Sequence, residues 1–530
     1  MPGLDQSVLD KLDFQEAINR INFDQRTDFI WAPHYVAIYG NAHADLIDRV
    51  SGDLRAGRFE PQLPISIEVP KRSGLSRPGT ILSPADRLIY QALADVIAPV
   101  LESQLDRTRV FSNVLQVHDA EHHMFEPHDT AYAKLHEVVQ QQCRSGKYSH
   151  AIKADVANFF ERMYQHNLVN LMLASGCQTE PVSLLEKLFL AWMDKNSHGI
   201  PQGMLPSDLF GNFYLVGLDT SYAIRDVPSA RFVDDIYLFL PSLQVARETL
   251  VELCALLRKE GLNLNEWKSS IKEAASLLEE ETELDRLFDQ ARQEVRQISA
   301  LGDGGSYGAV DVLTFGLNEA ANAGDAELPQ EQVEVNALVR LYEERKNQRP
   351  YVSDQIVQFC LPKFGRLGID AALDDTAQAL QSEPHLTRTY CLYLSALLKD
   401  DPEVAAPLES AFLTPSTHSD YQLLWPAVGL IASNSCSSHA VAQAARVMKN
   451  LGRSEAVRAI CAVLVGRHGN AAQRHLLKQH YQDEPSPYVR SALLYSARYV
   501  PKPERDTCLM SWGGHSATNA LIAKAVKKLA

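Results

Sequence analysis

The chain contains the stretch ARFVDDIYLFL at residues 230–240, in which Asp234 and Asp235 stand between apolar and aromatic residues typical of β-strands. The pattern predicts a strand–turn–strand hairpin with both carboxylates at its tip. Adjacent buried carboxylates repel each other unless a cation neutralises them, and hard oxygen ligands suit Mg²⁺. The pair is therefore a candidate half of a two-metal phosphoryl-transfer site. A polar turn without a metal is the alternative, since Asp is common in turns.

Three other stretches bear on this pair. The segment AIKAD at residues 151–155 predicts a short strand that ends at Asp155, which meets the acidic pair if the strands are neighbours. The segment HGIPQGMLP at residues 198–206 predicts a Gly/Pro-rich loop that opens a helix and lets a polar ligand approach closely. The segment EGLNLNEWKS at residues 260–269 predicts a helix end, a short strand and then a basic residue.

In this order the stretches resemble the palm of a reverse transcriptase. Asp155 with Phe159 and Phe160 matches the first acidic motif, and the loop at residues 201–203 with Ser207 and Asn212 matches the second. Residues 232–235 match the motif usually written Tyr-x-Asp-Asp, with Phe in place of Tyr, and residues 261–268 match the next. Upstream, VPKRSGLSRP at residues 69–78 resembles the basic fingers hairpin, and SPADRLIYQAL at residues 83–93 resembles the helix that follows it.

The resemblance implies an α+β right-hand polymerase fold, with fingers and a palm built on an antiparallel sheet with helices. It implies a nucleotidyltransferase, a DNA polymerase that adds dNTPs by two-metal phosphoryl transfer. The catalytic residues would be Asp155, Asp234 and Asp235. These acids and Val156 would bind two Mg²⁺ ions, for which Mn²⁺ is an alternative.

The resemblance also assigns residues to the incoming nucleotide. Lys71 and Arg77 would contact its phosphates, Gln202 would touch the nucleotide or the adjacent template, and Lys268 would give a proton to the pyrophosphate. An aromatic ring at Phe160 would leave no room for a 2′-hydroxyl and so favour deoxynucleotides. Each assignment has an alternative. Lys71 and Arg77 could belong to a solvated basic hairpin, and Gln202 to a plain turn. Lys268 could simply be exposed, and Phe160 could pack in the core.

The segment NFFERMYQH at residues 158–166 resembles the bacterial defence branch of the family, which includes abortive-infection and retron enzymes. Abortive-infection members carry α-helical HEAT-like repeats in place of a thumb. This implies a cytoplasmic homo-oligomer in antiphage defence, whose DNA product is primed by a protein hydroxyl or by a noncoding RNA. Tyr35 and Tyr39 are candidates for a priming hydroxyl. A retron-type enzyme and a non-enzymatic helical scaffold remain the rival hypotheses.

Composition sets further bounds. A chain of 530 residues with 45% hydrophobic residues suits two or three domains. We expect no membrane span, because no apolar run approaches 18 residues, and no signal peptide. Eight scattered cysteines predict reduced thiols. A net charge of −15 argues against strong nonspecific binding to long duplexes, since affinity for a polyanion rests on basic contacts. A polar segment is favoured over a metal site for the histidines at positions 118, 122, 123 and 128.

The predicted organisation has four parts. Residues 1–30 form a helical segment, residues 31–270 the fingers and palm, residues 271–330 an acidic helical linker with a loop at 302–308, and residues 331–530 a helical domain. Within the last part, EAVRA at 455–459 and PYVRS at 487–491 are spaced as in paired-helix repeats. An ordinary helical bundle is the alternative, and we recognise no second catalytic set there.

Overall fold

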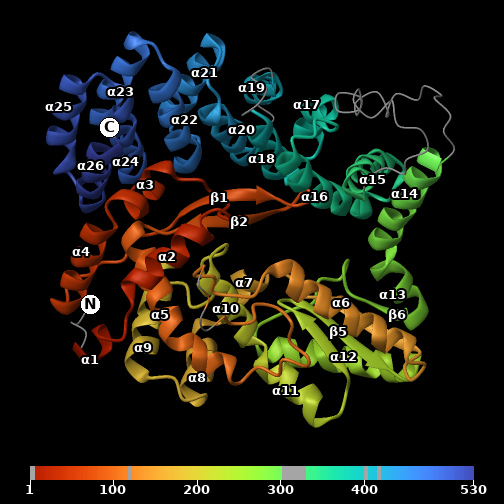
Figure 1. Cartoon of the computed structure of the whole chain (residues 1–530). Coiled ribbons are helices and arrows are strands. Elements are labelled where there is room, and N and C mark those ends of the chain that lie inside the picture. The colour runs from red at the N-terminus through yellow and green to blue at the C-terminus, as the bar shows by residue number, and fades with distance from the viewer. Residues whose placement is uncertain are drawn as a thin grey trace. The chain divides into compact units, whose positions relative to one another are not determined.

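The protein is described by a computed structural model that covers residues 6–116, 119, 121–300, 330–398, 404–414 and 419–529. The chain divides into two compact units (Figure 1). The first contains residues up to 69, then 76–278 and 444–530, and the second contains 70–75 and 279–443. The C-terminal residues thus join the same unit as the N-terminal half, which the linear boundaries drawn from the sequence do not anticipate.

A four-stranded antiparallel sheet lies at the centre of the first unit, with its strands in the order β4-β5-β3-β6. Its strands are β3 (His150–Asp155), β4 (Ser229–Phe232), β5 (Asp235–Leu240) and β6 (Ser270–Glu273). The β4–β5 hairpin pairs Phe232 with Asp235, and β3 places Asp155 opposite Asp235. The predicted hairpin and the predicted pairing of its neighbour are confirmed, and all three acids lie at one end of the sheet.

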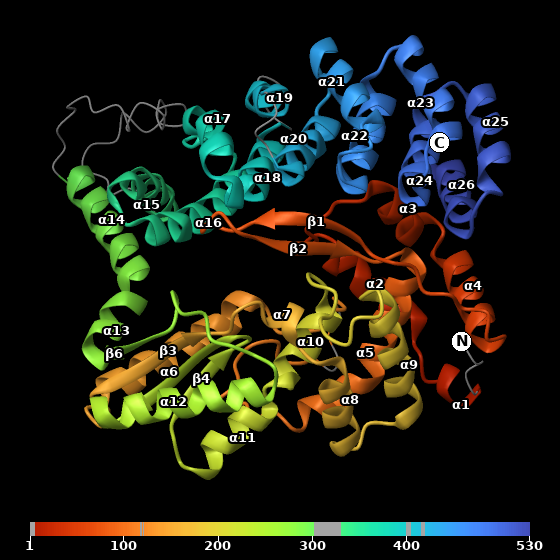
Figure 2. The same cartoon turned by 180° about the vertical axis from the view of Figure 1, so that it is seen from behind.

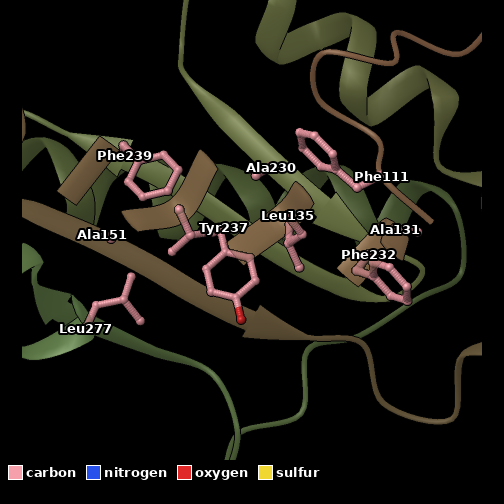
Figure 3. Packing of buried hydrophobic residues seen from close by; sticks show 10 residues of the cluster. Phe111, Ala131, Leu135, Ala151, Ala230, Phe232, Tyr237, Phe239 and Leu277 are labelled. Carbon is pink, nitrogen blue, oxygen red and sulfur yellow. The ribbon is translucent and has the colours of Figure 1, made fainter. Parts of the chain in front are cut away.

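Helices cover both faces of this sheet, which explains the unbroken apolar run of β5. The helix α6 (His128–Arg144) packs on β4 and β5, and α12 (Leu243–Lys259) packs on β3 and β5 (Figure 2). Side chains two apart on a strand share a face. Tyr237 and Phe239 therefore lie together and pack around Leu135 of α6 (Figure 3). The intervening Ile236 and Leu238 are also buried.

The strands β1 (Ile65–Pro70) and β2 (Ser76–Ile81) form a separate two-stranded sheet and confirm the predicted fingers hairpin. The predicted helix follows as α5 (Pro84–Glu102), and the Ser83 side chain caps it by accepting a hydrogen bond from the Asp86 main chain. Residues 70–75 at the hairpin tip belong to the second unit. There Arg72 pairs with Asp354, which also bonds His385 at 2.9 Å.

The remaining elements of the first unit are helical. Two helices lie within residues 6–24 of the segment predicted to be helical, and α3 packs on α24 and α26 near the other end of the chain. The helices are α1 (Gln6–Leu9), α2 (Phe14–Asp24), α3 (Pro33–Asn41), α4 (His43–Arg55), α7 (Phe159–Arg162), α8 (Gln165–Ala174), α9 (Thr179–Trp192), α10 (Leu205–Tyr214), α11 (Val216–Ile224), α22 (Glu455–His468), α23 (Ala471–Asp483), α24 (Pro487–Ser496), α25 (Lys502–Gly513) and α26 (Ala517–Leu529), with the 3₁₀ turn η5 (Ala497–Tyr499).

The second unit is also helical, as predicted for the chain beyond residue 330. Its described elements are α14 (Glu283–Ala300), α15 (Gln330–Glu344), η2 (Arg345–Asn347), α16 (Pro350–Leu367), α17 (Leu373–Ser382), η3 (Pro384–Leu386), α18 (Thr387–Leu397), α19 (Ala405–Leu413) and α20 (Asp420–Ala432), while α13 (Ala274–Glu281) and α21 (Ser438–Lys449) span its borders. Successive pairs such as α14–α15 and α19–α20 pack together. HEAT-like repeats remain a prediction, and the predicted loop at 302–308 lies outside the described residues.

Two expectations from composition can be compared with the structure. Within the described ranges, no helix is both long and apolar enough to cross a membrane. The eight cysteines all lie in these ranges, and no disulfide joins any of them.

Candidate active site

The end of the sheet concentrates negative charge. Asp155 is only 8% exposed, and Asp234 and Asp235 are half-buried beside it. Burial in the first place, and then the charges of Asp235 and Asp155, raise the pKa of Asp234 to about 7. The fold therefore holds three carboxylates where ionising all of them is unfavourable without a compensating cation.

The loop at residues 263–269 supplies such compensation on one side. The Lys268 Nζ donates to Asp155 Oδ1 at 2.9 Å, and the Asn265 Nδ2 donates to Asp155 Oδ2 at 3.0 Å. Burial opposes the charge of Lys268, but this hydrogen bond and the three acids raise its pKa above the ordinary value. The sequence-predicted Lys268 thus lies at the site. The short strand predicted here is wrong, because the loop makes only a single bridge between Leu264 and Val156, and the strand β6 begins at Ser270.

The donor set fits a hard divalent cation. Carboxylate oxygens are the ligands that Mg²⁺ prefers, and Mg²⁺ is usually held by one or two carboxylates together with substrate phosphates and waters. Within the described part of the chain, no group of three or more His, Cys, Asp or Glu side chains is arranged so that it could hold a metal ion. Val156 is buried beside Asp155, and only its main-chain oxygen could be a ligand, since its side chain has none.

The turn before Asp234 has an unusual backbone. Val233 has a φ of +54°, in the left-handed region that costs a β-branched residue about 1–3 kcal/mol. Both of its main-chain polar groups are hydrogen-bonded: its N–H donates to Ser112 Oγ at 2.9 Å, and its carbonyl accepts from Arg231 Nη1 at 2.8 Å. These bonds fix the backbone immediately before the acidic pair.

Arg231 belongs to a buried polar network that sequence reasoning missed. Its guanidinium forms a fork with the Asp219 carboxylate, with bonds of 3.0 and 2.6 Å, and is 1% exposed. Its other N–H groups donate to the side-chain and main-chain oxygens of Asn212, each at 3.0 Å, and to Val233. The available signal was Arg231 as the one basic residue of the stretch 230–240, together with Asp219 in the helix before it.

The predicted nucleotide-binding loop is held in a defined shape. The Thr80 hydroxyl bonds both the N–H and the carbonyl of Gln202, at 3.0 Å each. Gly203 has a φ of +87°, and a Cβ there would lie 2.8 Å from the Phe29 ring. The exposed Arg77 lies over the same ring, 4.7 Å from its centroid. The structure therefore brings Gln202 and Arg77 around Phe29.

Two other predicted nucleotide contacts have different outcomes. Phe159 is buried while Phe160 is half-buried, so one ring faces the core and the other is partly exposed. Phe160 rests against Gly211, where a Cβ would approach the ring to 2.7 Å. Lys71 lies in the second compact unit, so its place at the acids remains a prediction.

Several secondary predictions can also be placed. Tyr35 and Tyr39 are buried in the first unit, which does not suit a hydroxyl that must reach a nucleotide. His122 and His123 bond Glu16 and Asp119, which fits the polar-segment interpretation. His118 lies outside the described residues.

Comparison with known families agrees with this geometry. Residues 69–302 match the family described as "Reverse transcriptase (RNA-dependent DNA polymerase)". The chain contains a reverse transcriptase domain. The matched region includes the three acids, the loop of Gln202 and Lys268, and it makes the protein a nucleotidyltransferase.

Other comparisons add little to the reverse transcriptase match. No curated protein matches the chain in sequence. Among solved structures, the chain is similar to the telomerase of Candida albicans in complex with a fragment of telomeric RNA, with 12% identity and a TM-score of 0.30. That alignment covers 70% of this chain and 67% of the telomerase chain.

The raised pKa of Asp234 predicts a pH-dependent gain in stability for Asp234→Asn. An aspartate that titrates near 4 when unfolded and near 7 when folded loses stability as pH rises between these values, and the loss is complete above pH 7. Without metal, we expect Asp234→Asn to raise the free energy of unfolding by about 1–3 kcal/mol at pH 8, after allowance for solvent screening, and by clearly less at pH 5.

Denaturant unfolding in EDTA at both pH values measures this gain. Asp48→Asn is the matched control, because Asp48 is exposed on α4. A gain that is the same at both pH values, or equal to that of the control, would contradict the electrostatic account.

Proposed function

We propose that this protein is a DNA polymerase that extends a primer hydroxyl with deoxynucleotides at Asp155, Asp234 and Asp235. The observation that carries the proposal is the strand register, which puts Asp155 opposite Asp235 at the end of the sheet. A divalent cation would relieve the repulsion that raises the pKa of Asp234. Two Mg²⁺ ions, or Mn²⁺ in their place, would activate the attacking hydroxyl and neutralise the triphosphate and pyrophosphate.

Other residues would bind and orient the nucleotide. Arg77 is exposed beside the Gln202 loop, where its guanidinium could form a forked pair of hydrogen bonds with phosphate. The Lys268 ammonium, now on Asp155, carries a proton that it could donate to the leaving pyrophosphate. Lys71 would join the phosphate contacts from the hairpin tip.

Phe160 would select the sugar. Its ring is partly exposed, and the backbone of Gly211 supports it from behind. A ring that cannot retreat into the helix α10 would clash with a 2′-hydroxyl, so we expect deoxynucleotides to be preferred over ribonucleotides.

The biological role we propose is antiphage defence of the abortive-infection type, in the cytoplasm and as a homo-oligomer. The support is the resemblance of residues 158–166 and the helical part of the chain. A protein-primed, template-independent reaction would leave DNA covalently attached to the protein, by a tyrosine other than Tyr35 or Tyr39. A noncoding RNA as primer or template, as in retron-type enzymes, is the alternative. A non-enzymatic scaffold is disfavoured, because nothing in such a role requires three mutually repelling carboxylates.

The test is nucleotide incorporation by the purified full-length protein with Mg²⁺, each labelled dNTP, and no added primer or template. We expect labelled product with dNTPs, little with rNTPs, and at least a 1,000-fold loss in Asp155→Asn and Asp234→Asn, since each removes a metal-binding carboxylate. Protease sensitivity of the labelled species would indicate protein priming, and RNase sensitivity an RNA primer.

Asp48→Asn serves again as the control that should keep full activity. If no labelled product forms with or without an added primed template, or if the aspartate variants retain wild-type incorporation, the proposed function is wrong.

A further inference from the structure

The two residues that hydrogen-bond the strained turn at Val233 both also bond one buried side chain, Asn212. The Asn212 Oδ1 accepts from Ser112 Oγ at 2.8 Å and from Arg231 Nη1 at 3.0 Å. These two donors are also the partners of the Val233 N–H and carbonyl. Asn212 therefore connects both hydrogen bonds that hold the left-handed residue in place.

The network joins segments that are distant in sequence. Asn212 lies on α10, Asp219 on α11, and Arg231 on β4, while Ser112 precedes α6. All five N–H donors of Arg231 have acceptors within this network. Burial of an ion pair in a core often stabilises less than apolar packing of the same volume. What apolar packing cannot supply is directional hydrogen bonds to a main-chain carbonyl.

We propose that Arg231, Asp219 and Asn212 are positioning residues that hold Val233 in its left-handed conformation and thereby aim Asp234 towards Asp155. The inference rests on the proposed function, since its kinetic consequence is a loss of chemical rate. Asp219 holds the guanidinium by its fork, Arg231 and Ser112 hold the turn, and Asn212 links the two. None of the three positioning residues needs to touch the nucleotide.

The decisive variants are Arg231→Lys alone and combined with Val233→Gly. Lysine keeps the charge but cannot make the fork and the turn contact together, so we expect kcat to fall 10- to 100-fold while KM for the dNTP changes less than threefold. Glycine adopts positive φ without strain. We therefore expect Val233→Gly to raise the kcat of the Arg231→Lys variant at least tenfold. The same substitution should change the kcat of the wild type little.

Arg458→Lys is the matched control, because Arg458 forms a similarly buried pair with Glu484 among the C-terminal helices. It should lower thermal stability comparably and leave kcat unchanged at a temperature where all variants are folded. Equal losses of kcat in both lysine variants, or no recovery with Val233→Gly, would overturn the proposal.

A second readout separates this inference from the proposed function. Amide hydrogen exchange of the peptide covering residues 229–240 needs no catalysis. We expect at least tenfold faster exchange in Arg231→Lys than in Arg458→Lys. Unchanged exchange would refute the positioning role of Arg231 even if the wild type proves active. Faster exchange would support that role even if the wild type proves inactive.

A different observation concerns Trp267. It is 97% exposed, whereas Trp192, Trp425 and Trp512 are all buried. The main-chain N–H of Trp267 donates to Asn265 Oδ1 at 3.2 Å, and the Asn265 Nδ2 in turn donates to Asp155 Oδ2. The neighbouring main-chain N–H of Lys268 bonds the Asn265 carbonyl at 3.2 Å. The indole therefore stands on a loop that is anchored to the acidic site.

We also infer that Trp267 is a stacking platform for an unpaired nucleobase. Aromatic rings bind bases through their faces, whatever the base identity. A net charge of −15 weakens the overall attraction of a polyanion, so neutral stacking would supply affinity that net charge does not. The base could come from a single-stranded nucleic acid or from the incoming nucleotide, since both present the same π-face.

Fluorescence quenching in EDTA tests this site without any reaction. The probes are dA and dT 12-mers in one arm and dATP in the other. We expect Trp267→Ala to weaken binding of at least one probe about 5- to 100-fold, Trp267→Phe to keep most of the affinity, and Ile224→Ala, which removes another exposed apolar side chain, to have no effect. Because Trp267→Ala and Trp267→Phe lack the Trp267 indole whose fluorescence would be quenched, their affinities are measured by fluorescence anisotropy of labelled probes.

The two arms identify the source of the base. A loss with the oligonucleotides alone indicates single-stranded nucleic acid, and a loss with dATP alone indicates the nucleotide. Affinities for both probes that equal the wild type in Trp267→Ala, or no binding of either probe by the wild type, would overturn the inference.

Discussion

The repulsion among three carboxylates at one end of an antiparallel sheet is the constraint on which the other features of the site depend. The register of β3 against β5 brings Asp155 beside Asp235, and the hairpin turn adds Asp234. Burial, and then the charges of Asp235 and Asp155, make the ionisation of Asp234 costly, as its pKa near 7 indicates. A sheet packed on both faces by α6 and α12 is rigid enough to keep these groups together against that repulsion.

Two sets of contacts bear on this charge. On one side, the loop at residues 263–269 brings the ammonium of Lys268 and the amide of Asn265 to Asp155. On the other side, the Arg231 network holds the backbone that precedes Asp234. The first set compensates the negative charge of Asp155, and the second would control the direction in which Asp234 points. Such a division would let a bound cation replace Lys268 and Asn265 as the partner of Asp155 without loosening the turn at Val233.

Patterns that are local in sequence were predicted well. The β4–β5 hairpin and the strand ending at Asp155 are each encoded within about ten residues by strand-type residues and a turn, while the β1–β2 hairpin and the helix α5 were predicted from the family resemblance of residues 69–78 and 83–93.

Long-range contacts were not predictable in the same way. The partners of Arg231 come from residues 112, 212, 219 and 233, and no local pattern brings them together. The packing of α3 on α24 and α26 likewise joins opposite ends of the chain. The strand wrongly predicted near residue 262 shows the same limit. Leu262 and Leu264 alternate with asparagines as in a strand, but Asn265 and Lys268 bond the distant Asp155, and pairing with β3 begins only at Ser270.

Divalent-ion binding to the nucleotide complex tests the central claim most directly. Mn²⁺ binding can be measured by electron paramagnetic resonance with the full-length protein and a dNTP analogue that cannot be incorporated. The account predicts two bound ions per chain in the wild type and the loss of at least one in both Asp155→Asn and Asp234→Asn, with Asp48→Asn unchanged. Equal ion binding in the wild type and in the two active-site variants would contradict it.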